Sequence, residues 1–326
     1  MKLRQIRGAE DAEALYAVHV GRATRDGIEP TSPFEDFPSL EDLREALTEA
    51  VEAGQQDDWQ VAEIGDQVVG YGQIECWPEA DGTWVYLNQG WVLPEWRGQG
   101  VGMALLGWAE DLSRRLVAEE HPGEKAEFAA NASSTEIDAT ALLEHAGYSA
   151  GYTVLEMRLA ADIPPLHPMP AGLEVRPVLP EHYPLIVASV REAYRQEYDD
   201  GRFNEDVDPD EYLAELQEPR HDPTLWQVAW DGDQIAGQVI PIQKGDVADI
   251  FEVSVRPAWR RRGLARALLS RALHLVRERG ATTVRLSTVA EFRTRAKDLY
   301  YSVGFRMLKE FPRYRKPFSE MGADGS

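Results

Sequence analysis

The sequence contains one cysteine, Cys76, so no disulfide can form within the chain. This scarcity fits a reducing compartment, and Cys76 follows alternating residues that favour a half-buried strand position over a catalytic thiol. Long apolar runs are also missing: residues 1–6 contain none, and nowhere do eighteen apolar residues follow one another. We therefore expect a globular cytoplasmic protein with no membrane partner.

Positive charge is scarce in the first half of the chain. Residues 1–160 hold about 11 basic against about 30 acidic residues and account for nearly all of the net charge of -22. An acidic surface repels nucleic-acid backbones, so no nucleic-acid partner is expected. The charge suits a cationic substrate, although solubility alone also accounts for it. The seven histidines show no metal-ligand spacing, and no metal is expected.

The chain repeats itself with a period of about 160 residues. The letters Trp-Gln-Val-Ala, followed after two residues by Gly-Asp-Gln, occur at 59–67 and again at 226–234. Between the copies, residues 161–172 contain four prolines, which predicts a stiff linker. We therefore expect an N-terminal domain at 1–160 and a C-terminal domain at 173–326.

Each copy contains a strand, a short turn and a helix in that order. In the second copy, Phe251, Val253 and Val255 alternate with polar residues, and Pro257 ends the strand because it lacks the backbone N–H that a ladder needs. Apolar residues then recur at helical spacing. The turn at 260–265 opens this helix, so its free N–H groups and its three arginines suit a pyrophosphate.

The first copy has the same arrangement, since Val92 and Pro94 end a strand and residues 97–102 read Arg-Gly-Gln-Gly-Val-Gly. Two copies, each in a strand–turn–helix context, argue against a chance match. The motifs resemble the GNAT family of N-acetyltransferases, whose signature is Val-x-Pro followed by Arg/Gln-x-x-Gly-x-Gly/Ala. The tandem arrangement is similar to that of mycothiol synthase, another member with two GNAT domains.

The resemblance implies an α/β (α+β) fold class with two tandem GNAT folds, each a mixed, mostly antiparallel twisted sheet flanked by helices. It also implies acetyl-CoA as co-substrate, bound where the motif strand and the following strand splay apart. The residues expected to bind it in the second copy are Val253, Val255, Arg260, Arg261, Arg262, Gly263, Leu264 and Ala265. Those expected in the first copy are Val92, Arg97, Gly98, Gly100, Val101 and Gly102.

Acetylation of an amine needs a base for the ammonium proton and an acid for the leaving thiolate. Glu252 lies on the motif strand, facing away from Val253 and Val255, where the family commonly places its base. Residues 296–305 match the family pattern Ala-x-x-Leu-Tyr-x-x-x-Gly-Phe, which makes Tyr300 the expected general acid. A solvent-facing acid and a buried core tyrosine are the alternatives for these two residues.

The first copy lacks both proton-transfer residues, because Gln89 stands in the place of Glu252 and Leu143 in the place of Tyr300. We therefore expect the C-terminal domain to acetylate a primary amine of a small molecule and the N-terminal domain to be non-catalytic. A mycothiol-synthase-like or antibiotic-modifying activity is the alternative. A non-catalytic acyl-CoA-binding sensor is a third, because Arg293 replaces an asparagine that is frequent in the family.

The motifs do not identify the acceptor. Acidic residues crowd the segment 197–211, which hints at a cationic amine, although a solvated acidic loop also explains them. A monomer or a homodimer is expected.

Overall fold

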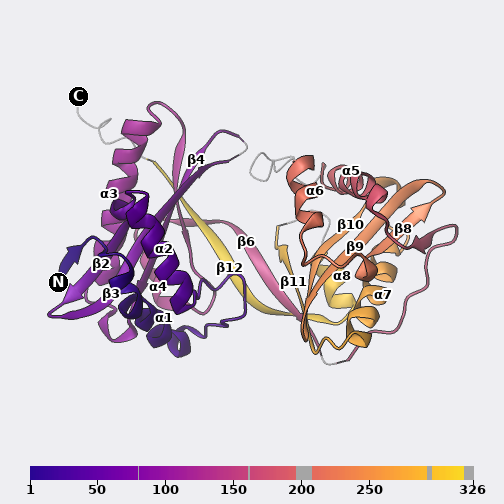
Figure 1. The fold of residues 1–326 in the computed structure, drawn as a ribbon, viewed down its shortest axis with the longest axis horizontal. Helices are drawn as coiled ribbons and strands as arrows, with labels where there is room; N and C mark the ends of the chain where they lie inside the picture. Colours follow the sequence, from indigo (N-terminus) through magenta and orange to yellow (C-terminus); the bar gives the residue numbers. More distant parts are fainter. Residues whose placement is uncertain (80, 161, 196–207, 292–295, 319–326) are drawn as a thin grey trace. The chain divides into compact units, whose positions relative to one another are not determined.

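The computed structural model describes residues 1–79, 81–160, 162–195, 208–291 and 296–318. These residues form two compact units (Figure 1). Unit 1 comprises Met1–Thr153 together with the described residues from Phe311 on, and unit 2 comprises Val154–Glu310. Each unit has a mixed sheet with helices packed on it, so the expected fold class is confirmed.

Unit 1 is built on a sheet with the strand order β1-β2-β3-β4-β5-β12. All neighbouring strands are antiparallel except the parallel pair β4 and β5. The strands are β1 (Lys2–Arg4), β2 (Trp59–Ile64), β3 (Gln67–Pro78), β4 (Trp84–Val92), β5 (Ala126–Asn131) and β12 (Phe305–Pro317). The helices are α1 (Ala12–Asp26), α2 (Leu40–Glu52), α3 (Val101–Glu120) and α4 (Ile137–His145).

Successive strand residues point to opposite sides of this sheet, and helices cover both of its faces. Helices α1 and α2 pack on the face that presents Trp59, Tyr71 and Trp91. Helix α3 packs on the other face, against Ile74 and Tyr86 among others. The sheet therefore separates an α1–α2 side from an α3 side.

Unit 2 repeats this plan with the strand order β7-β8-β9-β10-β11-β6 and one parallel pair, β10 and β11. The strands are β6 (Ser149–Leu159), β7 (Glu174–Arg176), β8 (Gln227–Asp231), β9 (Gln234–Lys244), β10 (Val247–Val255) and β11 (Thr283–Val289). The helices are α5 (Tyr183–Tyr194), α6 (Pro209–Gln217), α7 (Leu264–Glu278) and α8 (Ala296–Ser302). Helix α7 packs on one face, and α5 and α6 on the other.

In both units the motif strand separates from its parallel neighbour after four residue pairs. Strand β4 pairs with β5 only from Trp84 to Leu87, and β10 pairs with β11 only from Val247 to Ile250. Past those points the backbone groups of the motif strand on that side have no strand partner among the described residues. The expected splay is therefore confirmed, and it opens a gap beside each motif strand.

The final strand of each repeat runs from one unit into the other: β6 is divided between the units after Thr153, and β12 after Glu310 (Figure 1). Residues 154–158 of β6 pair with β11, and residues 313–317 of β12 pair with β5. The sequence predicts the strand at 153–159 as the last one of the first repeat's own sheet. An alternating pattern gives a strand but not its neighbour, so the exchange could not be seen in the sequence.

Because β12 belongs to both units, two substitutions in this one strand are predicted to destabilise different units. Tyr314→Ala removes a side chain that is buried in unit 1 against Leu106, Phe128 and Leu143, while Phe305→Ala removes one buried in unit 2. Each truncation should destabilise its unit by about 3 kcal/mol or more, since it leaves a cavity in a packed core. Hydrogen exchange followed by mass spectrometry should show Tyr314→Ala loosening β5 and Phe305→Ala loosening β11. Loosening of unit 2 alone by Tyr314→Ala would contradict the exchange.

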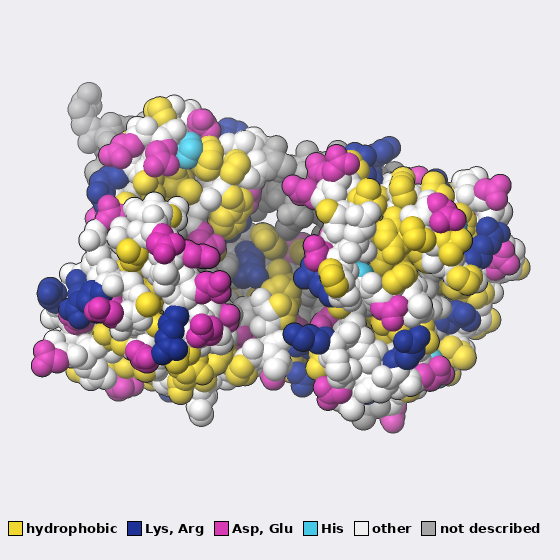
Figure 2. Space-filling view, in the orientation of Figure 1, with side chains coloured by type: hydrophobic (Ala, Val, Ile, Leu, Met, Phe, Trp, Pro, Cys, Tyr) yellow, Lys and Arg dark blue, Asp and Glu magenta, His cyan; other side chains and the backbone are white. Residues whose placement is uncertain are grey.

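Within the described ranges, none of the helices combines the length and the apolar character needed to cross a bilayer. Figure 2 shows the acidic side chains spread over the visible face, with Lys and Arg among them. On that face the acidic side chains are thus scattered rather than gathered at one place.

Candidate active site

The motif strand of unit 2 is bent by a β-bulge at Phe251. Ile250 pairs with Pro241 and Glu252 with Ile240, so Phe251 is an extra residue without a partner in β9. Before the bulge Ile250 packs on the α7 side, and after it Val253 does. A straight alternation predicts Phe251 on the same face as Val253, and this is wrong. The bulge turns Phe251 and Glu252 toward α5 and α6.

Glu252 is buried, with 6% of its surface exposed, so the solvent-facing alternative is wrong. The Tyr194 hydroxyl donates to Oε1 at 3.1 Å, the Tyr212 hydroxyl donates to Oε2 at 3.4 Å, and Ser254 also hydrogen bonds the carboxylate. Burial raises the pKa of Glu252 to about 7, and the three hydroxyl groups offset only part of that rise. A carboxylate with such a pKa can accept a proton near neutral pH.

Tyr300 lies on α8 and is 7% exposed, yet it lines a cavity instead of lying wholly within the core. Burial and the nearby charge of Glu252 raise its pKa, so its hydroxyl keeps its proton at neutral pH. Among the described residues, none hydrogen bonds this hydroxyl. The proton is therefore available to a group inside the cavity.

The turn between β10 and α7 has the geometry of an anion site. Gly263 precedes the helix in the left-handed conformation, with φ 85°, and no side chain caps the first helical N–H groups. Arg260 stabilises the turn, because its guanidinium donates to the carbonyls of Val255 at 2.9 Å and Ala193 at 2.6 Å. Arg261 and Arg262 are exposed beside the turn and add positive potential.

A cavity of about 600 Å³ connects this turn with Tyr300. The residues expected to bind acetyl-CoA mostly line it, and those that do are Val253, Val255, Arg260, Arg261, Gly263, Leu264 and Ala265. Arg262 lies outside the lining. The structure therefore brings the turn, the splayed strand and the candidate acid around one space.

Arg261 has an unfavourable backbone conformation, so replacing it by glycine is expected to increase the stability of the fold and to weaken acetyl-CoA binding. Its φ of 61° lies in the left-handed region, where a side chain costs about 1 kcal/mol relative to glycine. Arg261→Gly should therefore raise the thermal midpoint while weakening acetyl-CoA binding about 3- to 10-fold through the lost charge. Scanning calorimetry and titration calorimetry measure the two effects.

The matched control is Arg262→Gly, because the φ of Arg262 is not positive. This variant should lose stability as well as affinity. Equal stability changes in the two variants would contradict the strain assigned to Arg261.

Unit 1 has a corresponding cavity of about 470 Å³. Its motif strand pairs with β3 residue for residue from Trp84 to Val92, so it has no bulge. Gln89 and Leu143, which stand in the sequence at the places of Glu252 and Tyr300, both line the cavity. Val92, Arg97, Gly98, Gly100 and Gly102 line it as well, whereas Val101 is buried against the sheet.

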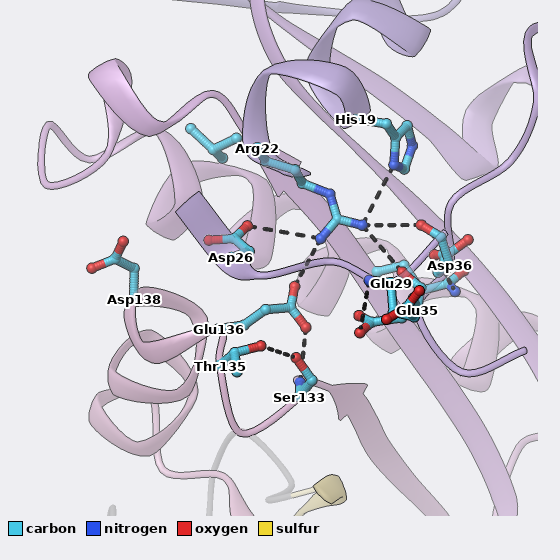
Figure 3. A network of polar contacts seen from close by, with 12 residues as sticks. His19, Arg22, Asp26, Glu29, Glu35, Asp36, Ser133, Thr135, Glu136 and Asp138 are labelled. Carbon is cyan, nitrogen blue, oxygen red and sulfur yellow. Dashed lines mark hydrogen bonds and ion pairs between the residues drawn. The ribbon is translucent and has the colours of Figure 1, made fainter. Parts of the chain in front are cut away.

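Arg97 is already neutralised in unit 1. Its guanidinium makes two hydrogen bonds to Asp26, at 2.6 and 2.7 Å, and a third to Asp138 at 3.1 Å. Beside this group, Figure 3 shows Arg22 reaching toward Asp26 and Glu136. Arg22 and Arg97 are therefore both paired with carboxylates. The unit 1 turn at residues 97–102 contains no second arginine that would correspond to Arg261.

Arg22 is the centre of this network and is 2% exposed. It donates to Glu136 at 2.9 Å and to the backbone carbonyls of Glu35 and Asp36 at 3.3 and 3.0 Å (Figure 3). One buried side chain thus ties α1, the segment before α2 and the start of α4 together. Removing it would leave buried carboxylate and carbonyl groups unpaired, so this side of the cavity is held rigidly.

Sequence reasoning missed the hydroxyl groups around Glu252. Tyr194 ends α5 and Tyr212 lies in α6, far from the motif in sequence, so no local pattern links them to the carboxylate. Ser254 could have been found, because a residue two positions after Glu252 on a strand shares its face.

The acidic segment gives little information on the acceptor. Its residues up to 207, and Arg293, lie outside the described residues. Asp208 accepts from the backbone N–H groups of Asp210 and Glu211 and caps α6, and those two acids lie in the favourable first turn of the helix. No group of three or more potential metal ligands occurs within the described part of the chain.

Two family models match the chain, one in each repeat. The model described as "Acetyltransferase (GNAT) family" matches residues 187–305, and the one described as "Acetyltransferase (GNAT) domain" matches residues 55–150. Among curated proteins, a mycothiol acetyltransferase of Beutenbergia cavernae is 35% identical over 99 residues, which are 29% of this chain. The match spans only 33% of that relative's length.

Two solved structures show the same architecture over nearly the whole chain. A GCN5-related N-acetyltransferase from Sphaerobacter thermophilus has a TM-score of 0.73 at 24% identity, covering 97% of this chain and 95% of its own. A tandem GNAT protein from the clavulanic acid biosynthesis pathway has a TM-score of 0.60 at 16% identity, covering 98% and 100%. At these identities the likeness concerns the fold alone.

Proposed function

The chain belongs to the GNAT acetyltransferase family, with one GNAT domain in each repeat, and from this premise we propose that unit 2 transfers the acetyl group of acetyl-CoA to a primary amine of a small molecule. One observation carries the proposal. A buried carboxylate with a pKa of about 7, Glu252, and a tyrosine with an unengaged hydroxyl, Tyr300, lie near one cavity at a bulged motif strand.

The groups that would hold acetyl-CoA are backbone groups at two places. The first N–H groups of α7, with Arg261 beside them, suit the pyrophosphate because they combine the helix dipole with positive charge. Within the described part of the chain, the backbone of β10 beyond Ile250 has no strand partner on the β11 side, so its groups on that side would hydrogen bond the extended arm and the thioester carbonyl. The cavity between them leads to Tyr300.

The chemistry then needs two proton transfers. Glu252 accepts one proton from the acceptor ammonium, and the neutral amine attacks the thioester carbon to form the new C–N bond. As the C–S bond breaks, Tyr300 gives its proton to the leaving sulfur. The second proton lost by nitrogen restores Tyr300 through solvent, and the proton on Glu252 is released, so the products are an amide, the CoA thiol and one proton.

A mycothiol-related acceptor is the second candidate, and the similarity to the Beutenbergia relative favours it. That similarity covers a third of the relative, so it supports the class of reaction better than the acceptor. The cationic character of the acceptor, the cytoplasmic location and the choice between monomer and homodimer stay predictions.

The test is transfer to a panel of primary amines. Purified protein is incubated with acetyl-CoA and, separately, an alkylamine, a polyamine, an amino sugar and an aminoglycoside, while thiol release and product mass are measured. We expect at least one acetylated amine and thiol release that depends on it. Tight binding of acetyl-CoA without transfer to any amine would instead support the sensor.

A further inference from the structure

The carboxylate of Glu252 does not reach the cavity in which the acceptor must meet the thioester. Phe251, Val253 and Tyr194 line that cavity, and Glu252 does not. The bulge turns Glu252 behind Phe251, toward α5 and α6, where 6% of its surface remains exposed. A proton from the acceptor ammonium therefore needs a carrier between the cavity and this carboxylate.

Tyr194 has the position of such a carrier. Tyr194 lines the cavity, and its hydroxyl donates to Glu252 Oε1 at 3.1 Å. The end of α5 that carries it is anchored, because Arg260 of the phosphate turn donates to the carbonyl of the preceding residue, Ala193, at 2.6 Å. The turn and the tyrosine are thus fixed relative to one another, which holds a proton donor in place at the carboxylate.

We propose that Tyr194 is a catalytic residue that contacts the acceptor amine and passes its proton to Glu252. The Tyr194 oxygen accepts a proton from the ammonium while its own hydroxyl proton moves to Oε1 of Glu252. The hydroxyl is neutral before and after the step, so one proton moves from the amine to the carboxylate and nothing else changes. The inference rests on the proposed acetyl transfer.

Two other hydroxyl groups contact the carboxylate, and each is placed differently. Tyr212 donates to Oε2 but does not line the cavity, since its ring stacks on Phe251. Ser254 lines the cavity, and its oxygen accepts from Gln238 Nε2 at 2.5 Å, which holds the serine hydroxyl in place at the carboxylate. The amide of Gln238 is oriented in turn, because its oxygen accepts from Ser189 at 2.7 Å. Tyr212 and Ser254 are therefore positioning residues that hold the carboxylate.

The titratable groups facing Glu252 come from three helices. They are Tyr194 on α5, Tyr212 on α6 and Tyr300 on α8, and beyond Tyr212 lies Glu215, which accepts from His221 at 2.6 Å. Burial raises the pKa of Tyr212 and of Tyr300, so both hydroxyl groups keep their protons near pH 7. A titration in the rate near that pH is assigned to the base at the end of the relay by its loss in Glu252→Gln.

The experiment compares pH profiles of kcat and kcat/KM for thiol release, using the best amine of the panel. Tyr194→Phe should lower kcat about 100-fold and remove the rise in rate near pH 7, while leaving the acetyl-CoA affinity unchanged. Tyr212→Phe is the matched control: it should keep a high-pH plateau within a few-fold of wild type and move the rise to higher pH, because the carboxylate loses a donor. Tyr194→His, which keeps a group able to transfer protons, should recover part of the rate.

Three results would overturn the relay. Tyr194→Phe that retains both the rise near pH 7 and most of kcat would show that Tyr194 carries no proton. Loss of the rise in Ser254→Ala alone would assign the route to Ser254. Wild-type protein that binds acetyl-CoA but acetylates no amine would remove the relay together with the proposed function, whereas active wild type with an active Tyr194→Phe removes the relay alone.

Discussion

Replacing Glu252 by glutamine is expected to lower kcat for amine acetylation at pH 7 about 100- to 1,000-fold, the usual contribution of a general base. Glutamine keeps the size of the side chain and can still accept hydrogen bonds from Tyr194 and Tyr212. The variant therefore removes the proton acceptor and little else. Steady-state rates of thiol release measure the loss.

The pH profile separates this loss from a general defect. Because burial raises the pKa of Glu252 to about 7, the wild-type rate should fall as the pH drops below 7 and level off above it. The variant depends on amine that is already neutral, so its rate should rise about tenfold per pH unit up to the amine pKa of about 10. The two profiles should therefore converge at alkaline pH. A constant ratio between them would contradict the assignment of Glu252 as the base.

The same substitution should stabilise the fold. A carboxyl with a raised folded pKa stabilises the protein below its unfolded value of 4.5 and loses that contribution as the pH rises through 7. The shift corresponds to about 3 kcal/mol, which the wild type loses at alkaline pH and glutamine does not. Denaturant unfolding should show Glu252→Gln as more stable at pH 8 and nearly equal to wild type near pH 4.5. An unstable variant at pH 8 would argue against burial of the charge.

Placing a carboxylate in the phosphate turn is expected to weaken acetyl-CoA binding about 100-fold or more, since two negative groups a few ångströms apart repel strongly at a protein surface. Ala265 is the suitable position: it is the second residue of α7, lies in the helical region and lines the cavity. A glutamate in the first turn of a helix also favours the helix dipole, so Ala265→Glu should keep its fold. Titration calorimetry measures the affinity, and thermal unfolding checks the fold.

Gly102→Glu is the matched variant in unit 1. Gly102 is the second residue of α3 and lines the unit 1 cavity, and the Cβ added there meets only the flexible end of Leu142, at 3.0 Å. Because Asp26 and Asp138 already neutralise Arg97, we expect the wild type to bind one equivalent of acetyl-CoA tightly. Gly102→Glu should then leave that equivalent intact. Two tight equivalents, with one lost in each variant, would show that the unit 1 turn also binds the ligand.

Local sequence signals were sufficient for the two turns, and the fold class followed from the family resemblance that these motifs carry. The period of two before Pro257, the helical stripe after Leu264 and Gly263 between them are all short-range patterns. They predicted a strand, an N–H-lined turn and a helix, which the structure contains as β10, the Gly263 turn and α7. The splay of the motif strand followed from the resemblance to the family. The short pairing of β4 with β5 and of β10 with β11 confirms it.

Long-range relations could not be predicted in the same way. The exchange of β6 and β12 depends on strand partners far apart in sequence, and the bulge at Phe251 depends on the register opposite Pro241. Tyr194 and Tyr212 become site residues only because α5 and α6 fold over Glu252. Likewise Arg97 matches the motif in sequence, but only the structure shows that Asp26 and Asp138 neutralise its charge.

The most direct test of catalysis in unit 2 is the turnover of the two matched turn variants with the same amine. Ala265→Glu and Gly102→Glu carry the same change at equivalent positions of the two repeats, so any general effect of an added carboxylate is shared. We predict that Ala265→Glu turns over at about a tenth of the wild-type rate or less at an acetyl-CoA concentration that just saturates wild type, while Gly102→Glu turns over at the wild-type rate. Turnover that survives in Ala265→Glu and disappears in Gly102→Glu would place the reaction in unit 1 and contradict the account.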